Sequence, residues 1–174
     1  MRQLYSHLPN APVLRVTSGQ RVFSGFPSKL TRLLLLTDLK AASRPAFESA
    51  IELTALFTAQ LTLMHGEPEQ NGTYIWRDDP ANSPESDSAR AALLCLMWEA
   101  RKRGLDVRLS TESGYVPEQV WRTAAQYDID LIVLAQKLFG ALCPLISRSH
   151  TFETVEGAPC PLLVVEDRAV RTLP

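Results

Sequence analysis

Four segments of this chain are apolar throughout, without the alternation of a half-exposed strand. They cover residues 33–37, 61–65, 131–135 and 162–165. Strands of this kind have no solvated face and are typical of a parallel sheet that helices cover on both sides. A fifth segment, residues 106–110, alternates between polar and apolar side chains and is expected at an edge of the sheet.

Helical patterns separate these segments. Ser43 is the expected N-cap of a first helix whose apolar face continues to Phe57, and a heavily buried second helix is expected over 88–103. A third helix begins near residue 115, and a short one is expected near 149–157. The order of elements predicts an α/β fold, a Rossmann-like five-stranded parallel sheet with helices on both faces.

The connection that begins at Gln136 is predicted to be a loop after the central strand. Ligands of such sheets bind beyond the carboxyl ends of the strands, so this loop is the first candidate for a functional site. Residues 66–86, rich in proline and glycine, form a second long connection, of the length that functional or mobile loops have.

Residues 1–30 lie outside the repeating pattern, and the domain proper is expected over 31–174. Proline and glycine interrupt every apolar run in this first part, which favours a loosely attached N-terminal arm. The alternative is that residues 12–17 add an edge strand to the sheet or reach a partner subunit.

The composition excludes several classes of protein. The 174 residues are 45% hydrophobic and 21% charged, with a net charge of −1, as in an ordinary globular domain without a nucleic-acid surface. No apolar run approaches the roughly 20 residues of a membrane span, and no signal peptide begins the chain, so a cytoplasmic protein without a membrane partner is expected. Three cysteines without paired spacing argue against disulfides, and Cys95 is expected to be a small core residue.

The familiar catalytic motifs are missing from the sequence. It contains no GxGxxG, GxxxxGK[ST], HExxH or GxSxG pattern, and its three histidines do not share the spacing of metal ligands. His65, at the end of a buried strand, is expected to be a core histidine. The residues therefore predict no catalytic group and no metal site.

Several segments together resemble the universal stress protein family. They are Leu33–Asp38 followed by Ala41–Ser43, the strand 61–65, residues 130–134 and residues 158–165. The ordered set at compatible spacing carries the resemblance, which covers roughly residues 31 to 166. It implies the adenine nucleotide alpha hydrolase-like form of the Rossmann-like fold. The family has one branch that binds ATP and one that does not hold nucleotide.

The ATP-binding branch carries a glycine loop of the form G-x2-G-x9-G-[S/T] after the fourth strand. Placed without gaps, the motif falls on Ala135, Leu138, Arg148 and Ser149, so only the serine is kept. Leu138 adds a branched side chain where backbone would approach phosphate, and Arg148 precedes an expected helix N-terminus. The favoured interpretation is that the phosphate cradle is lost. The alternative is that Arg148 and Lys137 supply positive charge and an anion still binds.

The resemblance assigns two further positions to this degenerate ATP site. Asp38 corresponds to a contact with the adenosine end of the nucleotide, and Gly66 leaves room where an adenine could lie. Each also has a purely structural interpretation, because Asp38 can cap the turn after its strand and a glycine can end a strand without a ligand.

The sequence thus predicts a non-enzymatic universal stress protein-like module that binds ATP weakly or not at all and has no cofactor. The alternatives are an ATP-binding family member with slow ATP hydrolysis, using ATP with magnesium, and an unrelated flavodoxin-like or nucleotide-transferring enzyme. The resemblance also implies a homodimer through the last strand, residues 162–165. An open apolar strand edge is an aggregation hazard, which gives this pairing a physical motive.

Overall fold

The structure is a computed structural model that describes most of the chain. It covers residues 10–17, 29–65, 75–76, 84–110, 114–142, 154–156 and 158–166. Side chains are described for residues 29–65, 88–110, 118–139 and 158–166. Strands and helices alternate along most of this length, as the hydrophobic pattern predicts.

The five predicted strands form the centre of one sheet. They are β2 (Arg32–Thr37), β3 (Gln60–His65), β5 (Asp106–Ser110), β7 (Leu131–Ala135) and β9 (Leu162–Glu166). All run parallel in the order β5-β3-β2-β7-β9, with β5 at an edge as its alternating pattern indicates. The fold class predicted from the sequence is confirmed.

Two further strands extend this sheet to seven. β1 (Asn10–Thr17) lies parallel to β9, with Val13 opposite Leu162. β8 (Thr154–Glu156) pairs antiparallel with β1. Of the two interpretations of residues 1–30, the added strand is the one that matches residues 10–17, and residues 1–9 and 18–28 lie outside the described part. The helix predicted near 149–157 is wrong for 154–156, where pairing with β1 holds the segment extended.

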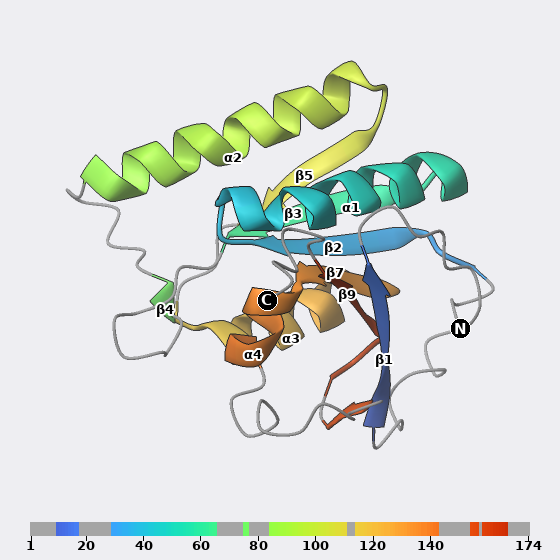
Figure 1. The fold of residues 1–174 in the computed structure, drawn as a ribbon. Helices are drawn as coiled ribbons and strands as arrows, with labels where there is room; N and C mark the ends of the chain where they lie inside the picture. Colours follow the sequence, from blue (N-terminus) through green and yellow to red (C-terminus); the bar gives the residue numbers. More distant parts are fainter. Residues whose placement is uncertain are drawn as a thin grey trace, which may run out of the picture.

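Helices cover both faces of the sheet (Figure 1). The 3-10 turn η1 (Ala41–Ser43) leads into α1 (Arg44–Phe57), which lies with α2 (Pro84–Lys102) on one face. On the other face lie α3 (Val116–Gln126) and α4 (Gln136–Leu142). α2 begins four residues before its predicted start at 88. A small separate sheet pairs β4 (Ile75–Trp76) with β6 (Gly114–Tyr115), so part of the long connection 66–86 is a strand.

β2, β3, β7 and β9 send side chains into two hydrophobic layers, one on each face of the sheet. The α1/α2 layer contains Leu33, Leu35, Leu61, Leu63, Leu131, Val133, Leu163 and Val165. The α3/α4 layer contains Leu34, Leu36, Met64, Ile132, Leu134, Leu162 and Val164. Both layers are buried, which explains why the sequence shows no alternation.

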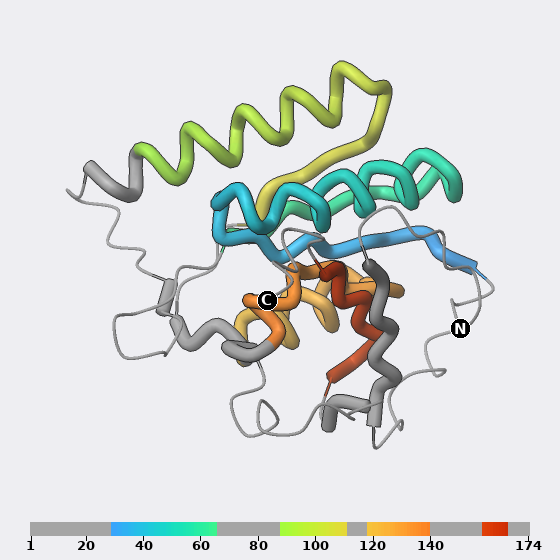
Figure 2. The backbone as a smooth tube through the Cα atoms, in the orientation of Figure 1, coloured from blue at the N-terminus to red at the C-terminus, as the bar shows by residue number. Residues whose placement is uncertain are grey.

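β2 and β7, which are far apart in sequence, are neighbouring parallel strands at the centre of the sheet, so their ends lie side by side (Figure 2). At the start of these strands, one carboxylate oxygen of Asp130, Oδ2, accepts three hydrogen bonds. The donors are the Thr31 amide (2.7 Å), the Thr31 hydroxyl (2.8 Å) and the Arg32 amide (2.9 Å). The acidic residue that precedes the central strand in sequence therefore fixes the register of β7 against β2.

Candidate functional site

Buried polar side chains gather where the parallel strands end. Thr37 ends β2 and Asp38 follows it, His65 ends β3 and Ser110 ends β5, and all four are buried. Register pairs Thr37 with His65, and Met64 with Ser110, so these ends lie side by side on adjacent strands. Since ligands of doubly wound sheets bind at this edge, the four residues define the candidate site.

Asp38 organises the turn from β2 into α1. Its Oδ1 accepts hydrogen bonds from the Lys40 amide (3.0 Å) and from the Ser43 hydroxyl (2.5 Å). Thr37 Oγ1 accepts a third bond from the Leu39 amide (3.0 Å), and Leu39 takes a positive φ of 61°. Ser43 does occupy the N-cap position of α1, but its hydroxyl serves Asp38 and makes no cap hydrogen bond.

The second oxygen of Asp38 has no partner among the residues that the structure describes. The residue is only 4% exposed, and Oδ2 is buried without a hydrogen bond in the structure. An unpaired buried acceptor carries a desolvation penalty of about 1–3 kcal/mol, so such an atom normally meets a donor from water or a ligand. Asp38 therefore both caps the turn, as its structural interpretation predicts, and offers a free acceptor at the candidate site.

In the described part of the chain, three other buried polar atoms lack partners, and they lie on the α3 side of the sheet. They are Ser110 Oγ at the end of β5, and Gln119 Oε1 and Thr123 Oγ1 in α3. Gln119 and Thr123 are four residues apart, so they share one side of α3. The hydrophobic pattern gives no indication of these atoms. The rule that picks out His65, a polar residue ending an apolar strand, could also have picked out Ser110.

The segment after β7 differs from its prediction. α4 begins directly after Ala135, at a position where the sequence predicts a loop. Leu138 is only 1% exposed and packs with Phe139 in the α3/α4 layer, beside Leu134 and Leu36. Leu138 thus turns into the core. The predicted loop is therefore wrong from Gln136 onwards, where the chain is helical, and the obstruction of a bound phosphate by Leu138 stays a prediction.

The remaining residues of the predicted ATP site are placed only in part. Ala135 is buried at the end of β7, whereas Gly66, Arg148 and Ser149 lie outside the described residues. Lys137 is exposed in α4. The structure therefore brings Asp38 and Ala135 to the same edge of the sheet, since Thr37 and Ala135 follow the paired residues Leu36 and Leu134.

The described cysteines and acidic residues form no metal site, and the buried thiol of Cys160 is unreactive. Burial, with a smaller effect from the charge of Asp130, raises the pKa of the Cys160 thiol to about 12, so this thiol stays protonated. Cys95 is exposed on α2, which corrects the prediction of a core residue. Within the described segments, no group of three His, Cys, Asp or Glu side chains could hold a metal ion.

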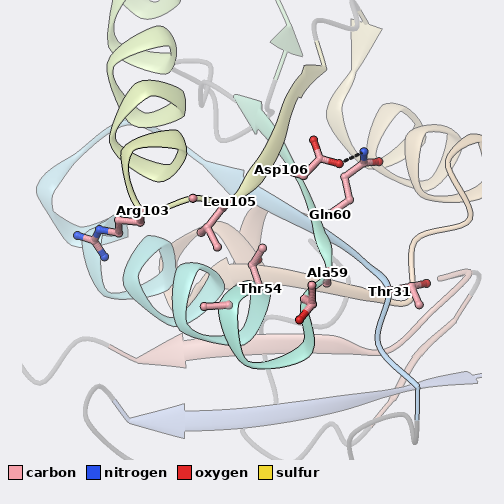
Figure 3. Close-up of a pocket in the computed structure, with 10 residues that line it drawn as sticks. Thr31, Thr54, Ala59, Gln60, Arg103, Leu105 and Asp106 are labelled. Atoms are coloured by element: carbon pink, nitrogen blue, oxygen red, sulfur yellow. Dashed lines mark hydrogen bonds between the residues drawn. The ribbon is translucent and has the colours of Figure 1, made fainter.

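A depression of about 470 Å³ lies at the opposite, amino-terminal edge of β3 and β5 (Figure 3). Its polar side chains already make hydrogen bonds within the chain. Thr54 Oγ1 donates to a backbone carbonyl of α1 (2.6 Å), Gln60 Nε2 donates to Asp106 Oδ2 (2.6 Å), and Arg103 binds carboxylates of α1 and α2. This depression is a less suitable ligand site than the carboxyl edge.

Comparison with known proteins connects this arrangement to one family. A sequence profile of the universal stress protein family matches residues 29–166. None of the curated proteins matches the chain. Among helices of the described part, none is long and apolar enough to cross a membrane.

Solved structures share the fold at low identity. A universal stress protein in complex with cAMP is 19% identical, with a TM-score of 0.54 over 80% of this chain and 98% of that one. The protein from Archaeoglobus fulgidus in complex with dAMP is 16% identical, with a TM-score of 0.52 over 77% and 96%. A family member from Burkholderia pseudomallei is 20% identical, with a TM-score of 0.53 over 79% and 97%.

Proposed function

Because this chain belongs to the universal stress protein family, we propose that it is a non-enzymatic stress-response module that binds ATP weakly or not at all. The observation that carries this proposal is the segment after β7. A flexible glycine loop can wrap several amides around phosphate oxygens, whereas a helix that begins directly after the strand offers only the amides of its first turn in a fixed direction. Here α4 follows β7 at once, and Leu138 anchors it in the core.

A second candidate function has its own supporting observation. Asp38 Oδ2 is buried at the carboxyl edge of the sheet without a partner among the described residues, and two of the similar solved structures are complexes with cAMP or dAMP. A donor on an adenosine moiety would satisfy this oxygen. The alternative is therefore an ATP-binding protein with slow ATP hydrolysis in the presence of magnesium, in which the adenosine end supplies most of the binding.

Calorimetric titration of the purified protein with ATP and magnesium separates these functions. The proposal expects no saturable heat at micromolar ATP. Binding at micromolar ATP that disappears in Asp38→Ala and persists in Lys40→Ala would overturn the proposal and support the alternative. Lys40 is the matched control, because its side chain is exposed and only its backbone amide contacts Asp38.

The non-enzymatic part of the proposal needs a separate measurement. ATP hydrolysis is followed by release of inorganic phosphate over hours, with Asp38→Ala as the reference for contaminating activity. Release equal to that of the variant supports a module without catalysis. Release well above it would contradict the proposal, even if the affinity for ATP were low.

The homodimer through the last strand remains a prediction. β9 lies between β7 and β1 in the sheet, so its outer edge is already paired with residues 13–17 of the same chain. A second copy can pair with β9 only after β1 has left it. The physical motive for that dimer is an open strand edge, and in this structure β1 of the same chain already covers the edge of β9.

A further inference from the structure

The outer side of α2 carries an apolar stripe that nothing in the described part of the chain covers. Trp98 is 57% exposed and Leu94 36% exposed, and Ala91 and Cys95 are exposed beside them. These residues follow the spacing i, i+3, i+4 and i+7, which places them on one side of the helix. An exposed tryptophan beside a leucine is unusual for a helix whose only task is to cover a sheet.

The opposite side of α2 already anchors the helix. Leu93, Met97 and Ala100 are buried in the α1/α2 layer, and α2 lies over the β5 edge of the sheet (Figure 1). The exposed stripe is therefore not needed to attach the helix. It points away from the sheet, where a second molecule can approach without a clash with α1.

We propose that α2 is a self-association surface through which two copies of this chain pack antiparallel, stripe against stripe. An isologous pair centred between Leu94 and Cys95 sets Trp98 of each copy against Ala91 of the other. The largest side chain of the stripe then meets the smallest one, as knobs do in holes. Near the two-fold axis, Leu94 of one copy lies beside Leu94 of the other, and Cys95 lies beside Cys95.

Charge selects this orientation over a parallel one. In sequence, Asp87 precedes the stripe by one helical turn, and Lys102 follows it by one turn. The antiparallel register places position 87 of each copy opposite position 102 of the other, so an acidic residue in the sequence is paired with a basic one at both ends. A parallel pair would align Lys102 with Lys102 and Trp98 with Trp98, which leaves Ala91 without a large partner.

The size of the stripe sets the expected strength. One helix face is smaller than the roughly 800 Å² per partner of a standard stable interface. We therefore expect a dimer that forms and dissociates with concentration rather than a permanent one. Trp98 dominates its energy, since a tryptophan buried at an interface commonly contributes 2 kcal/mol or more, about a 30-fold change in the dissociation constant.

Sedimentation velocity over a range of protein concentrations tests the surface directly. The unaltered chain should shift from monomer to dimer as concentration rises, and Trp98→Glu should weaken the dimer by at least about 30-fold. The matched control is Leu56→Glu, because Leu56 is 59% exposed on α1 and lies outside the stripe. Circular dichroism checks that both variants are folded. A monomer at every concentration, or dimers equally sensitive to both variants, would overturn the proposal.

Cys95 gives a test of the orientation. In the antiparallel pair the two Cys95 residues sit beside the symmetry axis, so their Cβ atoms come within the reach of a disulfide, about 3.5–4.5 Å. Mild oxidation of a Cys143→Ser, Cys160→Ser variant should yield a covalent dimer. Adding Trp98→Glu should abolish the crosslink. Dimers in sedimentation without a crosslink through Cys95 would exclude this register.

Exchanging the charges at positions 87 and 102 is a third test of the antiparallel orientation. Asp87→Lys and Lys102→Asp should each weaken the dimer, and the two changes in one chain should restore it. Equal weakening by the single and double variants would contradict an antiparallel pairing of these positions. If the stripe binds a different protein and not a second copy, the purified chain should stay monomeric in sedimentation. That result would also overturn the proposal.

Discussion

At the scale of single residues, Asp38 has two roles that conflict energetically. Its Oδ1 fixes the turn between β2 and α1 through Ser43 and the Lys40 amide, while its Oδ2 is buried without a partner. The hydrogen bonds of Oδ1 stabilise the fold, and the desolvation of the unpaired Oδ2 reduces that stabilisation. Retention of an unpaired buried oxygen is understandable where a ligand or an ordered water supplies the missing donor.

Replacing this residue tests how the two effects balance. Asp38→Ala leaves the buried Ser43 hydroxyl and the Lys40 amide without their acceptor, so we expect the free energy of unfolding to fall by about 1–3 kcal/mol. Urea denaturation followed by circular dichroism gives this value, and Lys40→Ala should change it little. An unchanged or higher stability for Asp38→Ala would show that the desolvation of Oδ2 outweighs the bonds of Oδ1.

The two assigned positions Asp38 and Leu138 show how far residue-level prediction reaches. Asp38 could be placed at the carboxyl edge because it directly follows an apolar strand, and the structure puts it there. The core position of Leu138 could not be predicted, because an ungapped motif fixes only its distance from Ala135. Whether a leucine at that distance faces a ligand or the core depends on the backbone conformation, which here is helical.

At the scale of elements, four charged side chains join α1 to α2. Arg44 binds Glu48 (2.6 Å) and also Glu99 of α2, and Arg103 binds Glu48 (2.8 Å) and Glu99 (2.9 Å). The hydrogen bond from Arg44 is the largest influence that lowers the pKa of Glu99. For Glu48, burial acts to raise the pKa, but the hydrogen bonds from Arg103 and Arg44 and their charges outweigh it and lower the pKa.

These shifts predict how stability depends on pH. A carboxylate whose pKa is lowered by folding stabilises the native state above its unfolded value of 4.5, and this contribution is lost as pH falls through the lower native value. The variant Glu48→Gln, Glu99→Gln should therefore lose less stability than the unaltered chain between neutral pH and acid. The difference should be small and should shrink in salt, since these side chains are partly exposed.

Thermal unfolding at a series of pH values measures this effect. Glu52→Gln is the control, because Glu52 lies on an exposed part of α1 and takes no part in the four-residue cluster. The double variant should be less stable than the control at neutral pH and should approach it in acid. Parallel pH profiles of the double variant and the control would mean that the cluster contributes nothing measurable.

The elements that could be predicted are those whose conformation, helix or strand, is determined by their own hydrophobic pattern. The central strands have both faces buried and so read as unbroken apolar runs, and α1 and α3 each show one apolar stripe. α4 and β8 are short, and their conformation depends on partners remote in sequence. Residues 154–156 are extended because β1 pairs with them, a contact across more than 130 positions that no local pattern reveals.

At the scale of the whole molecule, the addition of β1 changes which surfaces are open. In a five-stranded sheet β9 would be an edge, whereas here β1 pairs with it from Val13 to Thr17 and β8 then pairs with β1. The topology of the five central strands follows from their order in sequence and the right-handed crossover rule. The position of β1 does not, because any parallel strand could in principle pair with either edge.

The same pairing means that residues 13–17 control access to β9, and a deletion of residues 1–17 removes them. Removing them should leave an apolar strand with unpaired amides and carbonyls, which favours pairing with another chain. The deletion is best made in the Trp98→Glu background, where association through α2 is already suppressed. We expect this truncated variant to associate in light scattering after size exclusion, while the full-length Trp98→Glu chain stays monomeric.

Hydrogen exchange at residues 162–166 identifies where the truncated chains meet. If they pair through β9, the amides that face the former position of β1 should exchange quickly in dilute samples and become protected as concentration rises. The full-length variant should show protection at every concentration, because β1 is tethered and always available to pair. A truncated chain that stays folded and monomeric, with these amides unprotected throughout, would show that β1 is not what prevents association at this edge. The expected result would instead mean that the edge of β9 can pair either with β1 of the same chain or with β9 of a second chain. Pairing with β1 is then favoured because pairing within one molecule does not depend on concentration.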